Sequence, residues 1–182
     1  MMQKKKTFII VALMMVVILF LGCSKDQKDV LKFTYDSKDY NLNYGSIASI
    51  GATNHTPPTY EYDLLIAGPG IKYNTDSAKY LGKGNFIELT LYSAVSEFLK
   101  TGSYAYDGFE SKDSLTFDYG VVGINYDLAT ETGDTLIQIK TGIAVVEKRG
   151  NIYKLNLNLF TKDDKRIEAY YAGFLENITL SK

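Results

Sequence analysis

Hydrophobic and polar residues alternate with a period of two along most of the chain beyond residue 32. Strands with one buried face show this period, because successive side chains of a strand point to opposite sides. The alternation is clear in three segments, which span 60–66, 87–91 and 115–128. In the third segment the apolar parity changes at Gly120, and this predicts a bulge or a bend there.

The same pattern predicts a three-strand antiparallel meander in the C-terminal part. Polar turns at 148–151 and 162–165 separate its strands. The apolar residues that we expect on one face of the strands are Ile137, Ile139, Ile143 and Val145, then Tyr153, Leu155, Leu157 and Leu159, then Ile167, Ala169 and Tyr171. Each set alternates with polar residues, so this meander is the clearest element of the predicted fold.

Helical signals are limited to two short segments. One spans 93–100, with Ser93 as its N-cap and Gly102 as its stop, and the other is a turn at 77–81. Short strands at regular spacing otherwise dominate, and they favour an all-β fold, either an antiparallel β-sandwich or a calycin-like barrel.

A different pattern occupies the N-terminus, where Lys4, Lys5 and Lys6 precede an unbroken apolar run from 8 to 21. A membrane-spanning helix needs about 20 apolar residues, so this shorter run suits the h-region of an export signal. We therefore expect a signal peptide over 1–22, a tether over 23–32 whose polar and charged part follows Cys23, and a single β domain over 33–182.

The residues around the expected cleavage point, Leu19-Phe20-Leu21-Gly22-Cys23, resemble a bacterial lipobox, with Phe20 where the pattern more often has leucine. The resemblance implies cleavage before Cys23 and acylation of its thiol and amine, so that a lipid anchor at Cys23 attaches the protein to a membrane. Residues 24–29 resemble the short charged run that sends lipoproteins of Bacteroidetes to the outer face of the cell.

The β segments also resemble small exported lipoproteins of Bacteroidetes, whose domains are β-sandwiches or calycin-like barrels. The similar stretches are 86–93 with 101–104, 141–145 with 150–153, and 169–173. The resemblance implies an envelope protein anchored to the outer membrane, facing the periplasm or the cell surface. It transfers no site, because these stretches describe strands and turns.

The net charge and the cysteine content argue against some classes of function. The chain has 20 Lys and Arg against 21 Asp and Glu, and removal of the three N-terminal lysines leaves a net charge of −4. Nucleic acid is therefore not an expected partner, since it attracts clustered positive charge. The one cysteine is Cys23, so an acylated chain has no thiol for a disulfide, a metal or a nucleophile.

Catalytic motifs are few, and we expect neither an enzyme nor a cofactor. His55 is the only histidine and lies in a proline-rich loop, where a solvated residue is expected. The chain lacks the serine-hydrolase, zinc-protease and nucleotide-binding motifs. A glycosidase needs only two carboxylates, and those at or near strand positions are Glu88, Asp107, Glu110, Asp118 and Asp127. Solvated strand faces explain them more simply.

Aromatic residues offer the better indication of function. The chain has 15 Tyr and 9 Phe but no Trp, and Tyr92 and Tyr170 stand where the alternation places polar residues. Tyrosine suits both sugar stacking and wet protein interfaces, so a protein or a glycan is the expected partner. A simpler interpretation of these tyrosines is that this residue is favoured in half-exposed strands.

The Bacteroidetes resemblance further implies O-glycosylation, at an Asp followed by Ser or Thr and a small or aliphatic residue. Three positions match, with Ser77, Ser114 and Thr135 as acceptors.

The leading hypothesis is a noncatalytic binding or scaffolding lipoprotein. The alternative is a calycin-like carrier of a small apolar ligand or a glycan. A carrier should enclose a large pocket lined by inward Tyr and Ile residues, whereas a sandwich should be filled by them.

Overall fold

The alternating segments fold as strands of one large sheet in the computed structural model, which describes residues 30–179. The strands of this sheet are β1 (Lys32–Tyr35), β2 (Lys38–Asn41), β3 (Tyr44–Ala52), β4 (Tyr60–Ala67), β7 (Lys83–Ser93), β8 (Gly102–Tyr106), β9 (Thr116–Asp127), β10 (Thr135–Arg149), β11 (Ile152–Thr161), β12 (Arg166–Phe174) and β13 (Glu176–Ile178). A separate hairpin consists of β5 (Lys72–Asn74) and β6 (Lys79–Leu81). The all-β prediction is confirmed.

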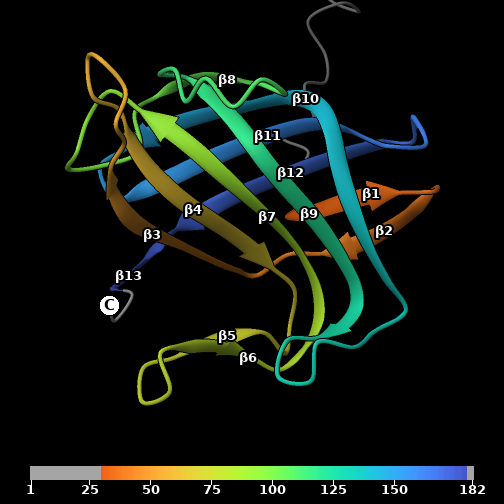
Figure 1. The fold of residues 1–182 in the computed structure, drawn as a ribbon. Coiled ribbons are helices and arrows are strands. Elements are labelled where there is room, and N and C mark those ends of the chain that lie inside the picture. Colours follow the sequence, from red (N-terminus) through yellow and green to blue (C-terminus); the bar gives the residue numbers. More distant parts are fainter. Residues whose placement is uncertain (1–29, 180–182) are drawn as a thin grey trace, which may run out of the picture.

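The large sheet curls strongly, with the strand order β13-β3-β4-β7-β9-β8-β10-β11-β12-β1-β2. Figure 1 shows β3, β4, β7 and β9 facing the blue strands β11 and β12. β13 follows β12 after one residue and pairs with β3, so the chain itself links the two sides of the curl. Gly45 of β3 allows this approach, because a Cβ there would lie 2.6 Å from Leu175 and 2.7 Å from Tyr171. The pairs β13–β3 and β8–β9 are parallel, and the other ladders are antiparallel.

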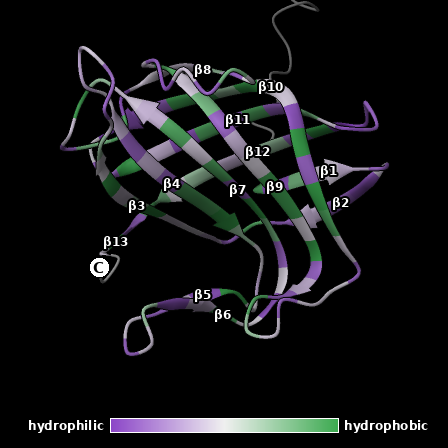
Figure 2. Ribbon diagram, viewed as in Figure 1, coloured by the Kyte–Doolittle hydropathy of each residue, from purple (hydrophilic) through white to green (hydrophobic). Residues whose placement is uncertain are grey.

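The inward faces of the strands form the main core. Figure 2 shows hydrophobic and hydrophilic residues alternating along these strands. A second, smaller core lies on the other face of β4, β7 and β9 and consists of Leu65, Ala67, Ile71, Phe86 and Val121, with Tyr80 of β6 packed against it. The alternation predicted only one buried face for these strands, although residues 64–67 form a continuous apolar run, which is consistent with a strand that is covered on both faces.

The C-terminal meander is confirmed as β10, β11 and β12. The predicted face of β11 is correct, since Tyr153, Leu155, Leu157 and Leu159 are all buried. The prediction for β10 is wrong in part, because the register shifts between Ile139 and Thr141. This bulge reverses the parity, so Ile139, Ala144 and Val146 point inward, whereas Ile143 is 46% exposed.

The expected irregularity in β9 exists, but not at Gly120. The register shifts between Tyr119 and Phe117, which leaves Asp118 as the extra residue. As a result Phe117 is buried while Tyr119 is largely exposed.

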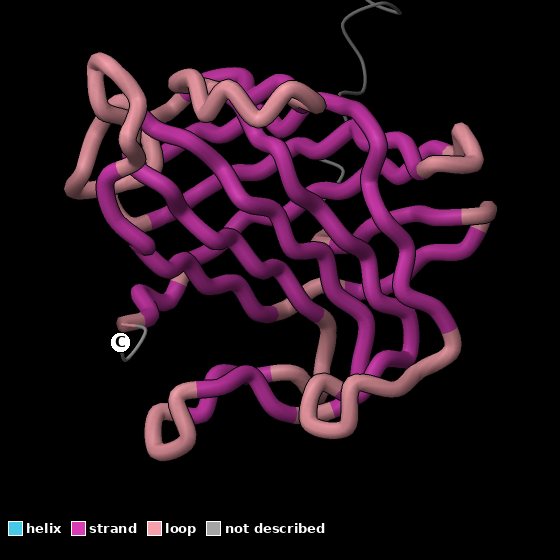
Figure 3. Tube along the Cα trace, viewed as in Figure 1, coloured by secondary structure: helices cyan, strands magenta, loops and turns pink. Residues whose placement is uncertain are grey.

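Neither helical segment is a helix, and this prediction is wrong. Figure 3 shows strands and loops without a helix in the described residues. The polar side chains at these segments stabilise turns and do not cap helices. Ser93 Oγ accepts hydrogen bonds from the backbone N–H groups of Val95 and Lys100, and Asn74 Oδ1 accepts one from the N–H of Ser77.

The first strand lies close to the expected start of the β domain. β1 starts at Lys32 and pairs with β12, and Phe33 is fully buried. The expected signal peptide and Cys23 lie outside the described residues. Within 30–179, no helix has the length and apolarity that would be needed to cross a membrane.

Candidate ligand pocket

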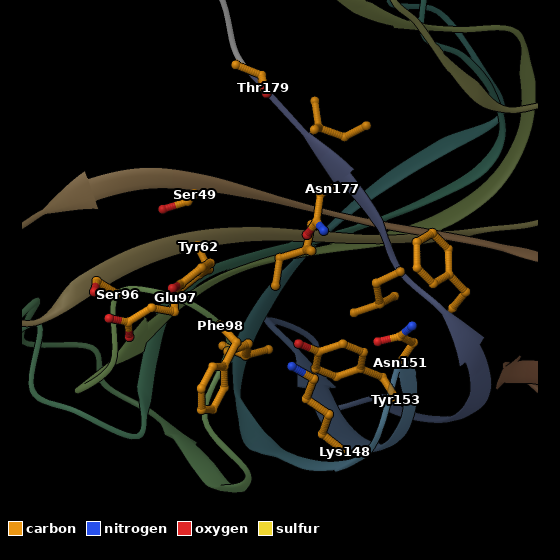
Figure 4. Close-up of a pocket in the computed structure, with 15 residues that line it drawn as sticks. Ser49, Tyr62, Ser96, Glu97, Phe98, Lys148, Asn151, Tyr153, Asn177 and Thr179 are labelled. Atoms are coloured by element: carbon orange, nitrogen blue, oxygen red, sulfur yellow. The ribbon is translucent and has the colours of Figure 1, made fainter.

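A pocket of about 310 Å³ lies at one end of the curled sheet, and we call it the end pocket. β3, β4, the loop 94–99, the β10–β11 hairpin and the segment around β13 all contribute to its lining (Figure 4). Its apolar wall includes Ile47, Leu175 and Ile178, and its polar groups include Lys148 and Asn177. Ligand sites commonly combine an apolar wall with a few polar groups in this way.

The loop 94–99 covers one side of the end pocket and is fixed by buried hydroxyl groups. Ser93 Oγ bonds to both ends of the loop, and Tyr62 donates a hydrogen bond of 3.0 Å to the carbonyl oxygen of Val95. Tyr104 donates one of 2.7 Å to the carbonyl oxygen of Lys100. Leu99 inserts into the core, so Phe98 beside it is held at the pocket with 40% of its surface exposed.

Lys148 provides the cation of the end pocket. Its Nζ atom lies 4.4 Å from the ring centroid of Phe98 and 5.3 Å from that of Tyr153. Figure 4 shows the ammonium beside both rings. A cation over an aromatic face is attracted by the ring quadrupole, and the two rings come from separate segments, so they fix the position of this flexible side chain.

Burial also affects Tyr62, which lines the pocket. Desolvation raises the pKa of Tyr62, and the nearby Tyr153 and Glu97 raise it further, while a hydrogen bond with Ser49 lowers it. Tyr62 therefore keeps its proton at neutral pH and acts as a hydrogen-bond donor to the loop. Glu97 itself is exposed to solvent at the rim.

The rim of the end pocket carries exposed apolar side chains. Phe174 lines the pocket and is 56% exposed, and its cross-strand neighbour Ile152 is exposed as well. Together with Phe98, they give the molecule an apolar rim around a cavity. Exposed apolar side chains beside a pocket are typical of interaction sites.

The space between the two sides of the sheet is filled by side chains. Tyr104, Phe33 and Phe117 are fully buried there, together with leucines and isoleucines of β4, β7 and β11. The end pocket adjoins this core through Tyr62, Tyr153 and Leu99.

The two tyrosines predicted as binding aromatics lie in different places. Tyr92 is only 2% exposed, and it donates a hydrogen bond of 2.8 Å to Asp118 Oδ2. Its ring is therefore not available for stacking on a ligand. Tyr170 is half-buried on the outward face of β12, where it lines a shallow groove with Ile143 and Val30. Neither residue lines the end pocket.

The three predicted sugar acceptors differ in accessibility. Ser77 is exposed in the β5–β6 turn, and Thr135 is exposed at the start of β10. The Oγ atom of Ser114, in contrast, is buried without a hydrogen-bond partner. A sugar on Ser114 would require the loop 107–115 to open.

His55 is not the solvated residue expected from its loop. Its Nδ1 lies 2.9 Å from the carbonyl oxygen of Pro57, and its Nε2 lies 2.9 Å from Asp113 Oδ1. The Oγ of Ser111 donates a hydrogen bond to Oδ2, the other oxygen of the Asp113 carboxylate. A hydrolase triad needs the serine hydroxyl on the imidazole, whereas here the carboxylate stands between the two. This arrangement ties the loop at 53–59 to the loop at 107–115.

Among the carboxylates considered for glycoside hydrolysis, Glu88 has an environment that differs from the expected one. Glu88 has the predicted outward parity, but it is not on a solvated face, and this expectation is wrong. Burial raises its pKa to about 6, and the nearby charge of Asp63 contributes. Among residues 30–179, no group of three or more His, Cys, Asp and Glu side chains is arranged to hold a metal ion.

The residues of the end pocket gave little signal in the sequence. Lys148 is part of a polar turn, and Phe98 lies within the segment mistaken for a helix. Their proximity arises only when the loop after β7 meets the β10–β11 hairpin. No family model, no curated protein and no solved structure matches this chain.

Proposed function

We propose that the chain is an exported envelope protein, anchored to the outer membrane by lipid at Cys23, whose β domain acts as a noncatalytic binding module. The recognition site is the end pocket with its rim. The observation that carries this proposal is the exposure of Phe98 and Phe174 around a cavity in a domain whose interior is otherwise filled. Exposed aromatic residues beside a pocket are common anchors for a partner or a ligand.

The alternative is a calycin-like carrier that encloses a small apolar ligand or a glycan. Its interior would be a large cavity lined by the inward side chains. Here the inward Tyr, Ile and Leu residues pack against one another, and the end pocket holds about ten water volumes. This packing supports the binding module over the carrier.

Replacement of Cys23 by alanine is expected to abolish membrane anchoring and leave an uncleaved or soluble product. One acyl chain binds a membrane only marginally, whereas the three chains that the lipobox implies anchor a protein stably. Membrane fractionation with a high-salt wash measures this. Equal recovery of both proteins in the membrane pellet, both at mature size, would contradict the anchor.

The recognition site is tested by a photo-crosslinking residue, benzoylphenylalanine, placed at Phe174 in the native host. We expect irradiation to give an adduct of defined mass at this position, because a bound partner or ligand contacts the rim. Intact-mass measurement of the purified protein detects the adduct.

Phe109 provides the matched control, since it is also phenylalanine, is 96% exposed and does not line the end pocket. The same crosslinker at position 109 should give no such adduct. Identical adducts at both positions, or none at position 174, would count against the end pocket as a recognition site.

A further inference from the structure

Lys148 lines the end pocket, and its ammonium group is not part of any ion pair found among residues 30–179. Its ammonium is held instead over the rings of Phe98 and Tyr153. The rings balance part of the charge without satisfying the N–H donors, because an aromatic face is not a strong hydrogen-bond acceptor.

A partly buried cation with free donors favours an anionic ligand. Charge-assisted hydrogen bonds between an ammonium and a carboxylate are among the strongest that a protein forms. Glu97, the acidic residue of the pocket lining, is exposed at the rim, so solvent screens its repulsion of an anion. Among the lining residues Lys148 provides the positive charge, whereas the negative charge of Glu97 acts on Tyr62 from the rim.

The wall of the pocket determines the rest of the ligand. Phe98 and Phe174 line it with 40% and 56% of their surfaces exposed, and they provide an apolar surface for the body of a ligand, whereas Ile47, Leu175 and Ile178 are almost fully buried. The volume of about 310 Å³ corresponds to about ten water molecules, which limits the ligand's size.

We propose that the end pocket binds a small amphipathic monocarboxylate of about ten non-hydrogen atoms. The carboxylate accepts hydrogen bonds from Lys148, and the apolar body lies against Phe98 and Phe174. This inference rests on the proposed function and names the ligand class of the same site.

The test is calorimetric titration of the full chain in lipid nanodiscs with 3-phenylpropionate, after subtraction of the signal from empty nanodiscs. The neutral probe 3-phenylpropan-1-ol has the same body without the charge. We expect saturable binding of the acid, and binding of the alcohol that is weaker by roughly tenfold or more, since one charge-assisted contact is lost. Equal affinity for the two probes, or no saturable binding of the acid, would overturn the proposal.

Variants of Lys148 test whether its charge causes the difference in affinity between the acid and the alcohol. Lys148→Met should weaken binding of the acid by roughly tenfold or more and leave binding of the alcohol unchanged. Lys148→Arg keeps the charge and should retain binding. Lys154→Met on the same hairpin changes an exposed lysine that does not line the pocket, so its affinity should match that of the unmodified chain. If Lys148→Met binds the acid as tightly as the unmodified chain, the assignment to Lys148 is wrong.

The ligand class and the proposed function fail in different ways. If 3-phenylpropionate does not bind while position 174 still gives its specific adduct, the carboxylate proposal is overturned and the binding module stands. If neither experiment gives a positive result, the end pocket is not the recognition site.

Discussion

Replacement of Leu157 by alanine is expected to lower the free energy of unfolding by about 2 to 5 kcal/mol, because it removes buried apolar contacts and leaves a cavity. Leu157 is 4% exposed and lies in the main core, at the centre of β11. Its cross-strand neighbours are Ala144 on β10 and Ala169 on β12. Neither alanine has a longer side chain to move into the space, so we expect a cost in the upper half of this range.

Asn156 gives the matched control for this prediction. It precedes Leu157 in the same strand, but its side chain is exposed on the other face. Asn156→Ala should therefore change the free energy of unfolding by less than about 0.5 kcal/mol. Urea unfolding followed by tyrosine fluorescence measures both variants, since the chain has no tryptophan. A larger loss for Asn156→Ala than for Leu157→Ala would show that the register of β11 is wrong.

Replacement of Glu88 by glutamine is expected to stabilise the protein at neutral pH by about 2 kcal/mol. Glu88 lies on β7 between the buried residues Leu65 of β4 and Val121 of β9. This apolar setting disfavours the carboxylate, and the charge of Asp63 disfavours it further, so the pKa rises from 4.5 to about 6. Tyr80 of β6 is close enough for Glu88 to contribute to the raised pKa of its hydroxyl.

The sign of the pH dependence follows from the direction of the Glu88 shift. The folded protein binds the proton more tightly than the unfolded chain, so this carboxyl reduces stability at pH values above about 6. The reduction is relieved as the pH falls from about 6 to 4.5, and it is absent below that range. The stabilisation by Glu88→Gln should therefore be full at pH 7.5 and vanish near pH 4.

Urea unfolding at a series of pH values measures the difference between Glu88→Gln and the unmodified chain. Glu147→Gln is the control, because Glu147 is exposed on β10. It should leave stability nearly unchanged at every pH. A stabilisation by Glu88→Gln that persists at pH 4, or one that is absent at pH 7.5, would show that the environment of Glu88 is not the one described here.

The amino-acid sequence alone determined the all-β class and the C-terminal meander. Period-two alternation in β11 and β12 needs no tertiary information, because each strand buries one face and the turns between them carry local signals in Gly150 and Asp164. The buried face of β4 and β7 was predicted for the same reason.

The positions of the register changes were beyond the sequence. The bulge near Lys140 reverses the face of Ile143 and Val145, and the one at Asp118 separates Phe117 from Tyr119. An apolar residue fits either parity locally, so only pairing with the neighbouring strand decides where the extra residue lies. The segment after Ser93 was mistaken for a helix because the same serine signal caps both helices and turns.

The candidate site depended on tertiary structure most of all. Lys148, Phe98 and Phe174 are far apart in the chain, and none belongs to a motif with fixed spacing. The curl of the sheet brings the β10–β11 hairpin, the loop after β7 and the end of β12 to one opening. Likewise, alternation placed Glu88 on the outward face, but only the packing of the β5–β6 hairpin near that face decided that its carboxyl is desolvated. Local sequence determines which way a side chain points where a strand is regular, whereas bulges and the surroundings of a side chain depend on segments that are distant in the chain.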